Sequence, residues 1–353
     1  MRIVRVVSVL FALSLSFFLR LFSLFSINKL RTIRLTGYGI SLRQRFLAAI
    51  LVLYGGQVLL GGQVLAAPLK VGITLHPYYS YVAEVVGDRA EIVPLVASGF
   101  NPHSYELQPS DLNRLMTMDA LVLNGIGHDE FAVHAVDKLL KSQPKLKAQL
   151  TLIYANKDVP LLAAANTRNA WNPHSFVSID AAIRQIYTIA RELGQLDPDN
   201  ARYFQKNAMN YARKLRQLKN KHMQALQQKN LTQLRIASTH NAYGYFLQEF
   251  GISIDTVIEP AHGVEPSATQ LQKTIDRIRT ANVNLLFTEL DMDNRYVKTI
   301  EEATGVGLYH FSHMTFGEYE KDKVYREMEQ NLETLSQALL DALDATFQQQ
   351  GAH

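Results

Sequence analysis

The sequence predicts an α/β protein in which two similar lobes with parallel sheets are joined by one long rigid helix. From residue 69 onward, short apolar runs rich in β-branched residues alternate with longer amphipathic segments. This alternation is typical of parallel sheets. It occurs twice, and the two series are separated by some 30 residues without Gly or Pro. A helix of that length is longer than one lobe needs.

The first series occupies residues 67–196, the predicted N-terminal lobe. Helices are expected to begin after Pro77, at Ser110, near Glu130 and at Ser178, because proline and hydroxyl residues favour the first turn of a helix. Four β-rich runs are expected to form its sheet: 70–75, 91–96, 120–124 and 150–154.

Residues 197–229 are expected to form the linking helix. Asp197 can cap its start and Pro198 suits the first helical position. Such a helix is roughly 45 Å long at 1.5 Å per residue. Its apolar residues recur at spacings of three and four, which gives it one buried face: Ala201, Phe204, Ala208, Tyr211, Leu215 and Leu218.

Residues 230–353 are predicted to form the C-terminal lobe. Ser267 and Gln270 resemble a capping box that opens a helix, and a last helix is expected over 318–347. The ligands of open α/β sheets bind beyond the carboxyl ends of the strands, so two facing lobes predict a ligand between them. The expected strands of this lobe are 234–238, 252–258, 284–288 and 307–311.

Residues 1–66 are expected to be a leader that ends in a signal peptide. A basic start, a short apolar core and the small-residue pattern at 64–66 predict export to the periplasm, with cleavage after Ala66. A retained membrane anchor is the alternative. The role of residues 1–40 stays open between an over-extended gene start and a first membrane helix.

The charge of the chain is uneven. Residues 1–67 hold eight Lys or Arg and no Asp or Glu, which leaves 28 basic and 32 acidic residues in the rest. The net charge of +4 therefore belongs to the leader, and nucleic acid is not expected as a partner. The sequence has no cysteine, which excludes a disulfide framework, thiolate metal sites, cysteine nucleophiles and a lipid-modified cysteine.

Three histidines and one carboxylate are candidate metal ligands. His103 and His174 lie in near-identical contexts, each directly after an Asn-Pro pair that breaks regular structure and fixes the backbone before the imidazole. His240 follows the predicted strand 234–238, and Asp293 follows the predicted strand 284–288. No local motif such as His-x-x-x-His joins these residues, so their spacing alone does not establish a site.

From about residue 69 to residue 347, the chain resembles the periplasmic zinc- and manganese-binding proteins of ABC importers, the cluster A-I or TroA-like/ZnuA-like family. In that family the metal lies between the lobes. The resemblance implies His103, His174, His240 and Asp293 as ligands, with Asp291 or Glu289 as alternatives to Asp293. Five segments carry the resemblance in order: 101–111, 172–176, 238–246, 259–267 and 287–295.

The resemblance implies a solute-binding protein, not an enzyme, that captures a transition-metal ion and delivers it to a membrane permease. Three imidazoles and one carboxylate suit Zn²⁺. Mn²⁺ is the second choice, because it is favoured as carboxylates replace imidazoles. A monomer is expected. The alternatives are a zinc-dependent hydrolase with a three-histidine site and an adhesin in which the metal is a structural staple.

The sequence favours simpler roles for four other histidines. His128 follows the predicted strand 120–124 near the expected cleft and is a candidate for a supporting group or transient ligand. His310 and His313 are expected to be structural or surface residues. His222 is assigned to the solvated face of the linking helix.

Overall fold

The computed structural model describes residues 67–98, 105–143, 149–164, 170–226, 229, 231, 234–258, 266–290 and 295–351. The predicted leader, with its signal peptide, lies outside these residues. Residues 67–353 form a compact unit of their own. Among the helices of the ranges given above, none has the length and apolarity that a membrane span requires.

The first sheet is entirely parallel and has the strand order β2-β1-β3-β4. Its strands are β1 (Leu69–Ile73), β2 (Ala90–Pro94), β3 (Ala120–Leu123) and β4 (Thr151–Tyr154). The strands are connected by the helices α3 (His76–Val86), α4 (Pro109–Leu115) and α5 (Glu130–Ser142). After β4 come the 3-10 turns η2 (Ala155–Asp158) and η3 (Ser175–Val177) and the helix α7 (Ile179–Leu196). Ser178 caps α7 by accepting a hydrogen bond from the backbone N–H of Ala181.

The second sheet repeats this topology with the order β6-β5-β7-β8, again entirely parallel. Its strands are β5 (Ile236–Ser238), β6 (Thr256–Val257), β7 (Leu285–Glu289) and β8 (Gly307–Phe311). Its helices are α9 (Gly244–Gln248), α10 (Ala268–Thr280), α11 (Arg295–Thr304) and α12 (Lys323–Gly351). The predicted capping box is present, with Ser267 and Gln270 bonded in both directions. The predicted fold class is confirmed.

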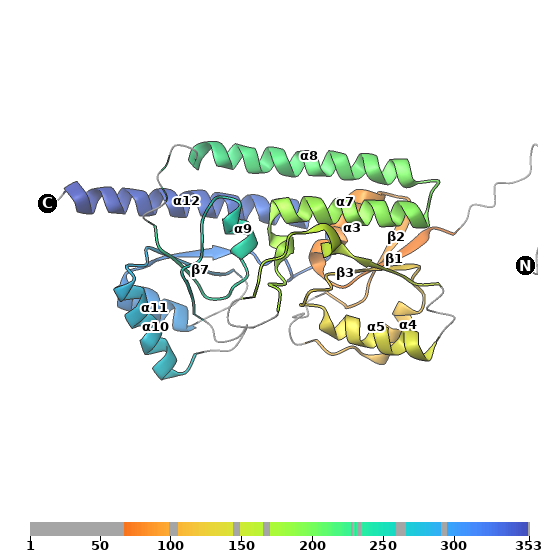
Figure 1. Cartoon of the computed structure of the whole chain (residues 1–353), viewed down its shortest axis with the longest axis horizontal. Coiled ribbons are helices and arrows are strands. Elements are labelled where there is room, and N and C mark those ends of the chain that lie inside the picture. The colour runs from red at the N-terminus through yellow and green to blue at the C-terminus, as the bar shows by residue number, and fades with distance from the viewer. Residues whose placement is uncertain are drawn as a thin grey trace, which may run out of the picture. The chain divides into compact units, whose positions relative to one another are not determined.

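The long helix α8 (Ala201–Leu226) lies between the two series in the chain. It begins at Ala201 and not at Pro198, because the backbone N–H and side-chain amide of Asn200 bond back to Asp197 and close a turn first. Figure 1 shows α8 alongside α7 and α12, and it packs against α3 and α7 of the first lobe and against α12 of the second.

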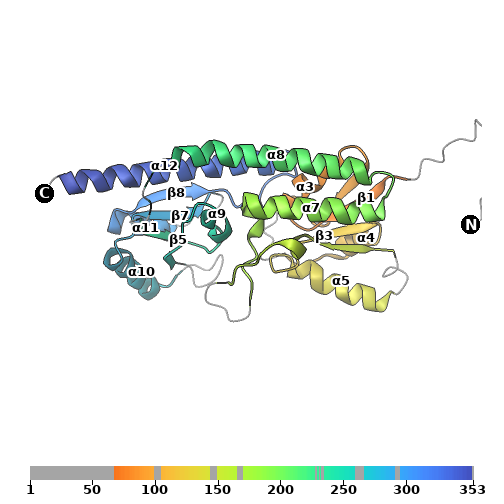
Figure 2. The ribbon, with the colours of Figure 1, turned by 45° about the horizontal axis from the view of Figure 1, so that its top comes forward.

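Side-chain alternation along the strands divides the apolar residues into a central core and one outer core per lobe. In β3, Val122 joins the central core while Leu121 joins the outer core under α4 and α5. In β7, Phe287 joins the central core while Leu286 joins the outer core under α10 and α11. The helices α3, α7, α8 and α12 contribute residues to this central core, and Figure 2 shows them on one side of the two sheets. Because both lobes share that core, a large hinge motion would expose apolar side chains, each worth about 1.5–3 kcal/mol when buried.

The connection between β8 and α12 returns to the first lobe. The His76 ring stacks on Tyr319 at 4.2 Å between centroids, and Tyr319 donates a hydrogen bond to the Val96 carbonyl. Burial lowers the pKa of His76 to about 4, so at neutral pH its Nε2–H donates to the Gly317 carbonyl at 2.9 Å. These contacts fix the segment that also carries His313.

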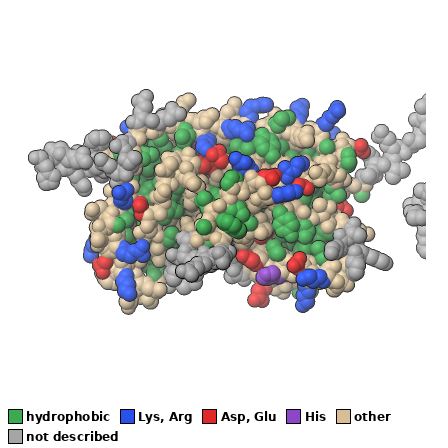
Figure 3. Space-filling model, in the orientation of Figure 1, with side chains coloured by type: hydrophobic (Ala, Val, Ile, Leu, Met, Phe, Trp, Pro, Cys, Tyr) green, Lys and Arg blue, Asp and Glu red, His purple; other side chains and the backbone are tan. Residues whose placement is uncertain are grey.

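Charged side chains are distributed over the surface. Figure 3 shows Lys and Arg interspersed with Asp and Glu on one face, and the described part of that face carries no extended basic patch. This agrees with the assignment of the excess positive charge to the leader, and it gives no support on that face to nucleic-acid binding.

Candidate metal centre

Four histidines and one glutamate converge at the carboxyl ends of strands from both sheets. His128 follows β3, His174 lies between β4 and α7, His240 follows β5, and His313 follows β8. Glu289 is the last residue of β7. This is the edge at which open parallel sheets place their ligands.

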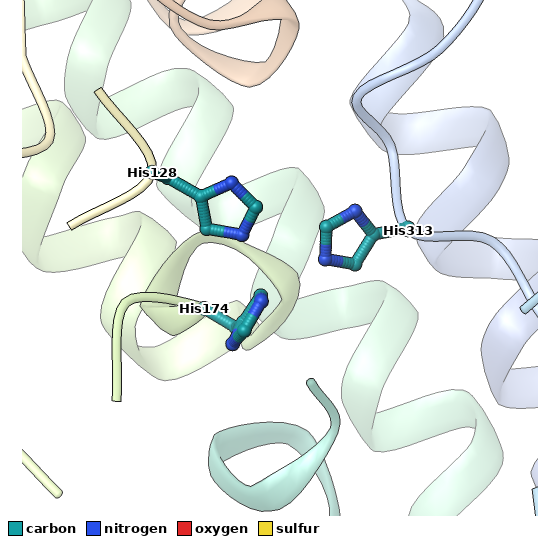
Figure 4. Close-up of side chains that lie close together, drawn as sticks. All are labelled: His128, His174 and His313. Carbon is teal, nitrogen blue, oxygen red and sulfur yellow. The ribbon is translucent and has the colours of Figure 1, made fainter. Parts of the chain in front are cut away.

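The side chains form two overlapping groups that share His313. One ligand atom each of His128, His174 and His313 lies within 4.8 Å of the others, and the same holds for His240, Glu289 and His313. Figure 4 shows the rings of His128, His174 and His313 gathered around a common space, each from a different segment. His174 Nε2 and His240 Nε2 are 2.9 Å apart, a separation that suits two nitrogens each about 2.0–2.1 Å from one ion.

The group is almost entirely buried. His128, His174, His313 and Glu289 are each less than 5% exposed, whereas His240 is partly exposed and therefore forms the solvent side of the group. Imidazole and carboxylate groups without solvent need partners of opposite or complementary chemistry. The ligand atoms within each group of three are close enough to share one divalent cation.

Asn172 orients His174 and connects it to the second lobe. The His174 Nδ1–H donates to Asn172 Oδ1 at 2.8 Å, and the His174 backbone N–H donates to the same oxygen. This tautomer leaves Nε2 without a proton and directed at His240 Nε2. The Asn172 Nδ2 donates to the Asn241 carbonyl at 2.8 Å, so one amide holds the two histidine-bearing loops together.

Replacing Asn172 with alanine is expected to weaken metal binding by roughly 10–100-fold, the usual cost of losing the hydrogen bond that orients a ligand. Calorimetric titration with Zn²⁺ measures the effect. Asn207→Ala is the matched control, because Asn207 also donates to a backbone carbonyl, that of Val85, but on α8. Equal affinity in the two variants would contradict the orienting role.

Two residues at the site have left-handed backbone conformations although they are not glycine. His128 has φ 72° and Met314, next to His313, has φ 65°. Such conformations cost about 1–3 kcal/mol and persist where the surroundings enforce them, often at functional sites. The strained backbone therefore indicates that the directions of the His128 and His313 imidazoles are important for the site.

Asp129 holds the turn that carries His128. Its carboxylate accepts hydrogen bonds from the backbone N–H groups of Asn124 at 2.6 Å and Gly125 at 3.0 Å and from the Thr74 hydroxyl at 2.9 Å. Burial raises the pKa of Asp129 to about 6, and these hydrogen bonds oppose the rise. The fully buried carboxyl group thus closes the turn from Asn124 to Asp129.

The Asn124 side chain joins the turn of His128 to that of His174. Its Nδ2 donates to the Gly127 carbonyl at 2.7 Å and to the Pro173 carbonyl at 2.9 Å. Its Oδ1 accepts from Asn156 at 2.7 Å, and Asn156 Oδ1 accepts from Ser175, next to His174. A buried and well-connected polar network therefore places both histidines.

Two of the four predicted ligands lie among the described residues and two lie outside them. His174 and His240, from different lobes, lie side by side. His103 and Asp293, like Asp291, lie outside the described residues, so their ligation stays a prediction. Glu289, the alternative to Asp293, belongs to the group.

The expectation for His222 is wrong, and of the two roles expected for His313 the surface role is excluded while the structural role stays a prediction. His313 is not a surface residue but is 1% exposed at the centre of the group, whereas His310 on β8 is exposed. His313 lies beyond the end of β8, where the chain turns inward. His222 is 8% exposed and not solvated, because α12 packs along that side of α8.

Comparison with known proteins identifies a family. The sequence model of "Zinc-uptake complex component A periplasmic", ZnuA, matches residues 71–338. The metal ABC transporter substrate-binding lipoprotein FimA of Streptococcus parasanguinis is 26% identical over 275 residues, covering 77% of this chain and 89% of the relative. The manganese ABC transporter substrate-binding lipoprotein PsaA of Streptococcus pneumoniae is 26% identical with the same coverage.

Solved structures agree with these relatives. The substrate-binding protein FpvC of Pseudomonas aeruginosa, in complex with Ni²⁺, is 46% identical, has a TM-score of 0.72, and covers 78% of this chain and 98% of its own. A complex of FpvC with Mn²⁺ matches equally well and is covered completely. A crystal structure of ZnuA is 25% identical with a TM-score of 0.64, covering 77% of this chain and all of that one.

Proposed function

Because the chain belongs to the ZnuA family of periplasmic zinc-uptake components, we propose that it is the substrate-binding protein of an ABC importer for a divalent transition-metal ion. One observation carries the proposal: imidazoles from both lobes meet, with Nε2 of the buried His174 and Nε2 of the partly exposed His240 2.9 Å apart. An ion held there contacts both lobes, so its presence favours the arrangement that a permease recognises.

We propose that the ion is bound by His174, His240 and His313, with Glu289 as the carboxylate among the described residues. His128 lies beside this set and supplies a further nitrogen. His103 and Asp293, which the sequence predicts as ligands, complete the proposed site from their own segments.

The proposed cargo is Zn²⁺, with Mn²⁺ as the weaker alternative. Imidazole ligands suit zinc and its neighbours in the first transition row, and most sites bind Zn²⁺ more tightly than Mn²⁺. Mg²⁺ and Ca²⁺ prefer oxygen ligands, so a site rich in nitrogen discriminates against them. The Ni²⁺ and Mn²⁺ complexes of FpvC favour a site that accepts several transition metals.

The proposed protein acts in the periplasm and has a membrane permease as its partner. The central core shared by both lobes and the helix α8 favour loop ordering or a small tilt on metal binding over a wide hinge closure. A zinc hydrolase needs an open coordination position beside a general base. In the proposed site, Glu289 and the additional imidazole of His313 fill the coordination positions that a hydrolase would keep open. This arrangement disfavours turnover.

Calorimetric titration of metal-free protein tests the proposal. We expect one tight equivalent of Zn²⁺ and weaker binding of Mn²⁺, with Zn²⁺ affinity lowered by more than roughly 100-fold in His174→Ala and His240→Ala, since loss of a ligand exceeds the loss of an orienting partner. His134→Ala, on the exposed side of α5, should bind as wild type. Absence of tight transition-metal binding in the wild type would refute the function.

His103→Ala and Asp293→Ala extend the same titration to the two predicted ligands outside the described residues. Both are expected to bind Zn²⁺ more weakly than wild type. Unchanged affinity in either variant removes that residue from the proposed ligand set and leaves the function standing.

A further inference from the structure

A second cluster of metal-ligating side chains lies between the two long helices. Figures 1 and 2 show α8 and α12 side by side. His222 lies near the end of α8, and Glu329 and Glu333 lie one turn apart on α12, on the same face of that helix. One ring nitrogen of His222 and one carboxylate oxygen of each glutamate lie within 4.8 Å of one another.

The imidazole of His222 has an unused nitrogen. The residue is 8% exposed, and its Nε2 is buried without a hydrogen-bond partner among the described residues. Buried polar atoms in folded proteins are nearly always paired. The orphaned nitrogen is therefore an observation independent of the acidic residues, and it points to a ligand.

The charges around the cluster suit a divalent cation. Burial and Lys221 lower the pKa of His222, while Glu333 and Glu329 oppose this effect, so the neutral ring that binds metal predominates at neutral pH. Two carboxylates balance the charge of the ion. Lys221 Nζ lies 3.3 Å from Glu329 Oε1, and one oxygen of that carboxylate lies within 4.8 Å of a His222 ring nitrogen.

We propose that His222, Glu329 and Glu333 form a second site for a divalent transition-metal ion, one that ties α8 to α12. One imidazole and two carboxylates are a nitrogen–oxygen donor set that Zn²⁺ accepts. Glu333 is exposed and Glu329 partly exposed, so water completes the coordination. With a single imidazole, this site binds Zn²⁺ more weakly than the centre between the lobes. An ion there stabilises the helix pair independently of the cargo site.

Titration with Zn²⁺ separates the two sites. The wild-type protein is expected to take up a tight equivalent and then a weaker one. His222→Ala should lose only the weaker phase, and His313→Ala should lose only the tight phase. His134→Ala, another helical histidine but exposed, should keep both phases.

If His222→Ala disturbs the packing, Glu333→Gln tests the same site. Glu333 is exposed on its helix, and glutamine has nearly the same shape as glutamate. The Glu333→Gln variant is expected to raise the dissociation constant of the weaker phase at least about 10-fold. It should also abolish the rise in melting temperature that wild type shows once Zn²⁺ exceeds one equivalent. A single equivalent in the wild type, or a weaker phase that persists in both variants, would overturn this site and leave the cargo site unaffected.

Discussion

His313→Ala is expected to lose tight Zn²⁺ binding, with an affinity more than roughly 100-fold below that of the wild type. His313 belongs to both groups of ligand atoms, with His128 and His174 on one side and with His240 and Glu289 on the other. Its Nδ1 lies 2.8 Å from the Thr315 hydroxyl, which orients the ring. Removing it opens both groups at once. Calorimetric titration of the metal-free variant measures the loss.

His310→Ala is the matched control for this variant. His310 lies three residues earlier, on β8, and is exposed, so its removal changes the histidine content without changing the site. Circular dichroism and the melting temperature of the metal-free proteins show whether His313→Ala remains folded. If a folded His313→Ala variant bound Zn²⁺ as tightly as wild type, His313 would be a packing residue beside the site and not a ligand.

The sequence predicts the fold well because its local patterns agree with the final packing. The capping box at Ser267 and the break of regular structure at Asn172-Pro173 need only neighbouring residues, and both are present. Strand β6 is the exception. The sequence predicts 252–258, whereas only Thr256–Val257 pairs with β5, because the backbone of Ile252 bonds to Leu247 and closes the turn after α9. The β-propensity of an apolar run does not predict which of its residues pair with a neighbouring strand.

The site was less predictable, since its members meet only through tertiary structure. The sequence marks His174 by the Asn-Pro pair before it and His240 by its position after a predicted strand. His313 also follows a predicted strand, but its spacing from His310 resembles a surface pattern. The rule that ligands follow strand ends applies to it as much as to His240. The position of His313 after a predicted strand thus indicated a candidate ligand, but its helix-like spacing from His310 favoured a structural or surface role.

His222 shows a similar conflict between two patterns. Its neighbour Lys221, an exposed cation, suggests a solvated face of α8. Yet His222 lies four residues after Leu218 and four before Leu226, both of which are buried, so helical periodicity places it on the inner face. The charges of adjacent residues describe other faces of the helix, and the spacing of four is the better guide to burial.

Glu289→Gln is expected to lower Zn²⁺ affinity by roughly 100-fold while keeping the fold. Glu289 is 1% exposed at the end of β7, where little water screens its charge and its attraction to a divalent ion is strong. Glutamine has nearly the same shape but no charge, so the substitution isolates the electrostatic contribution. Glu302→Gln, on the exposed side of α11, controls for the loss of one negative charge from the second lobe.

Asp293→Asn, measured beside Glu289→Gln, identifies the carboxylate that balances the ion. A loss in Glu289→Gln alone assigns the role to Glu289, which is grouped with His240 and His313. A loss in Asp293→Asn alone supports the ligand predicted from the sequence and removes Glu289 from the set. Losses in both variants mean that two carboxylates face the ion. Such a site has more oxygen ligands than the sequence predicts, and because oxygen ligands suit Mn²⁺, its preference for Zn²⁺ over Mn²⁺ would be smaller than the imidazoles alone imply.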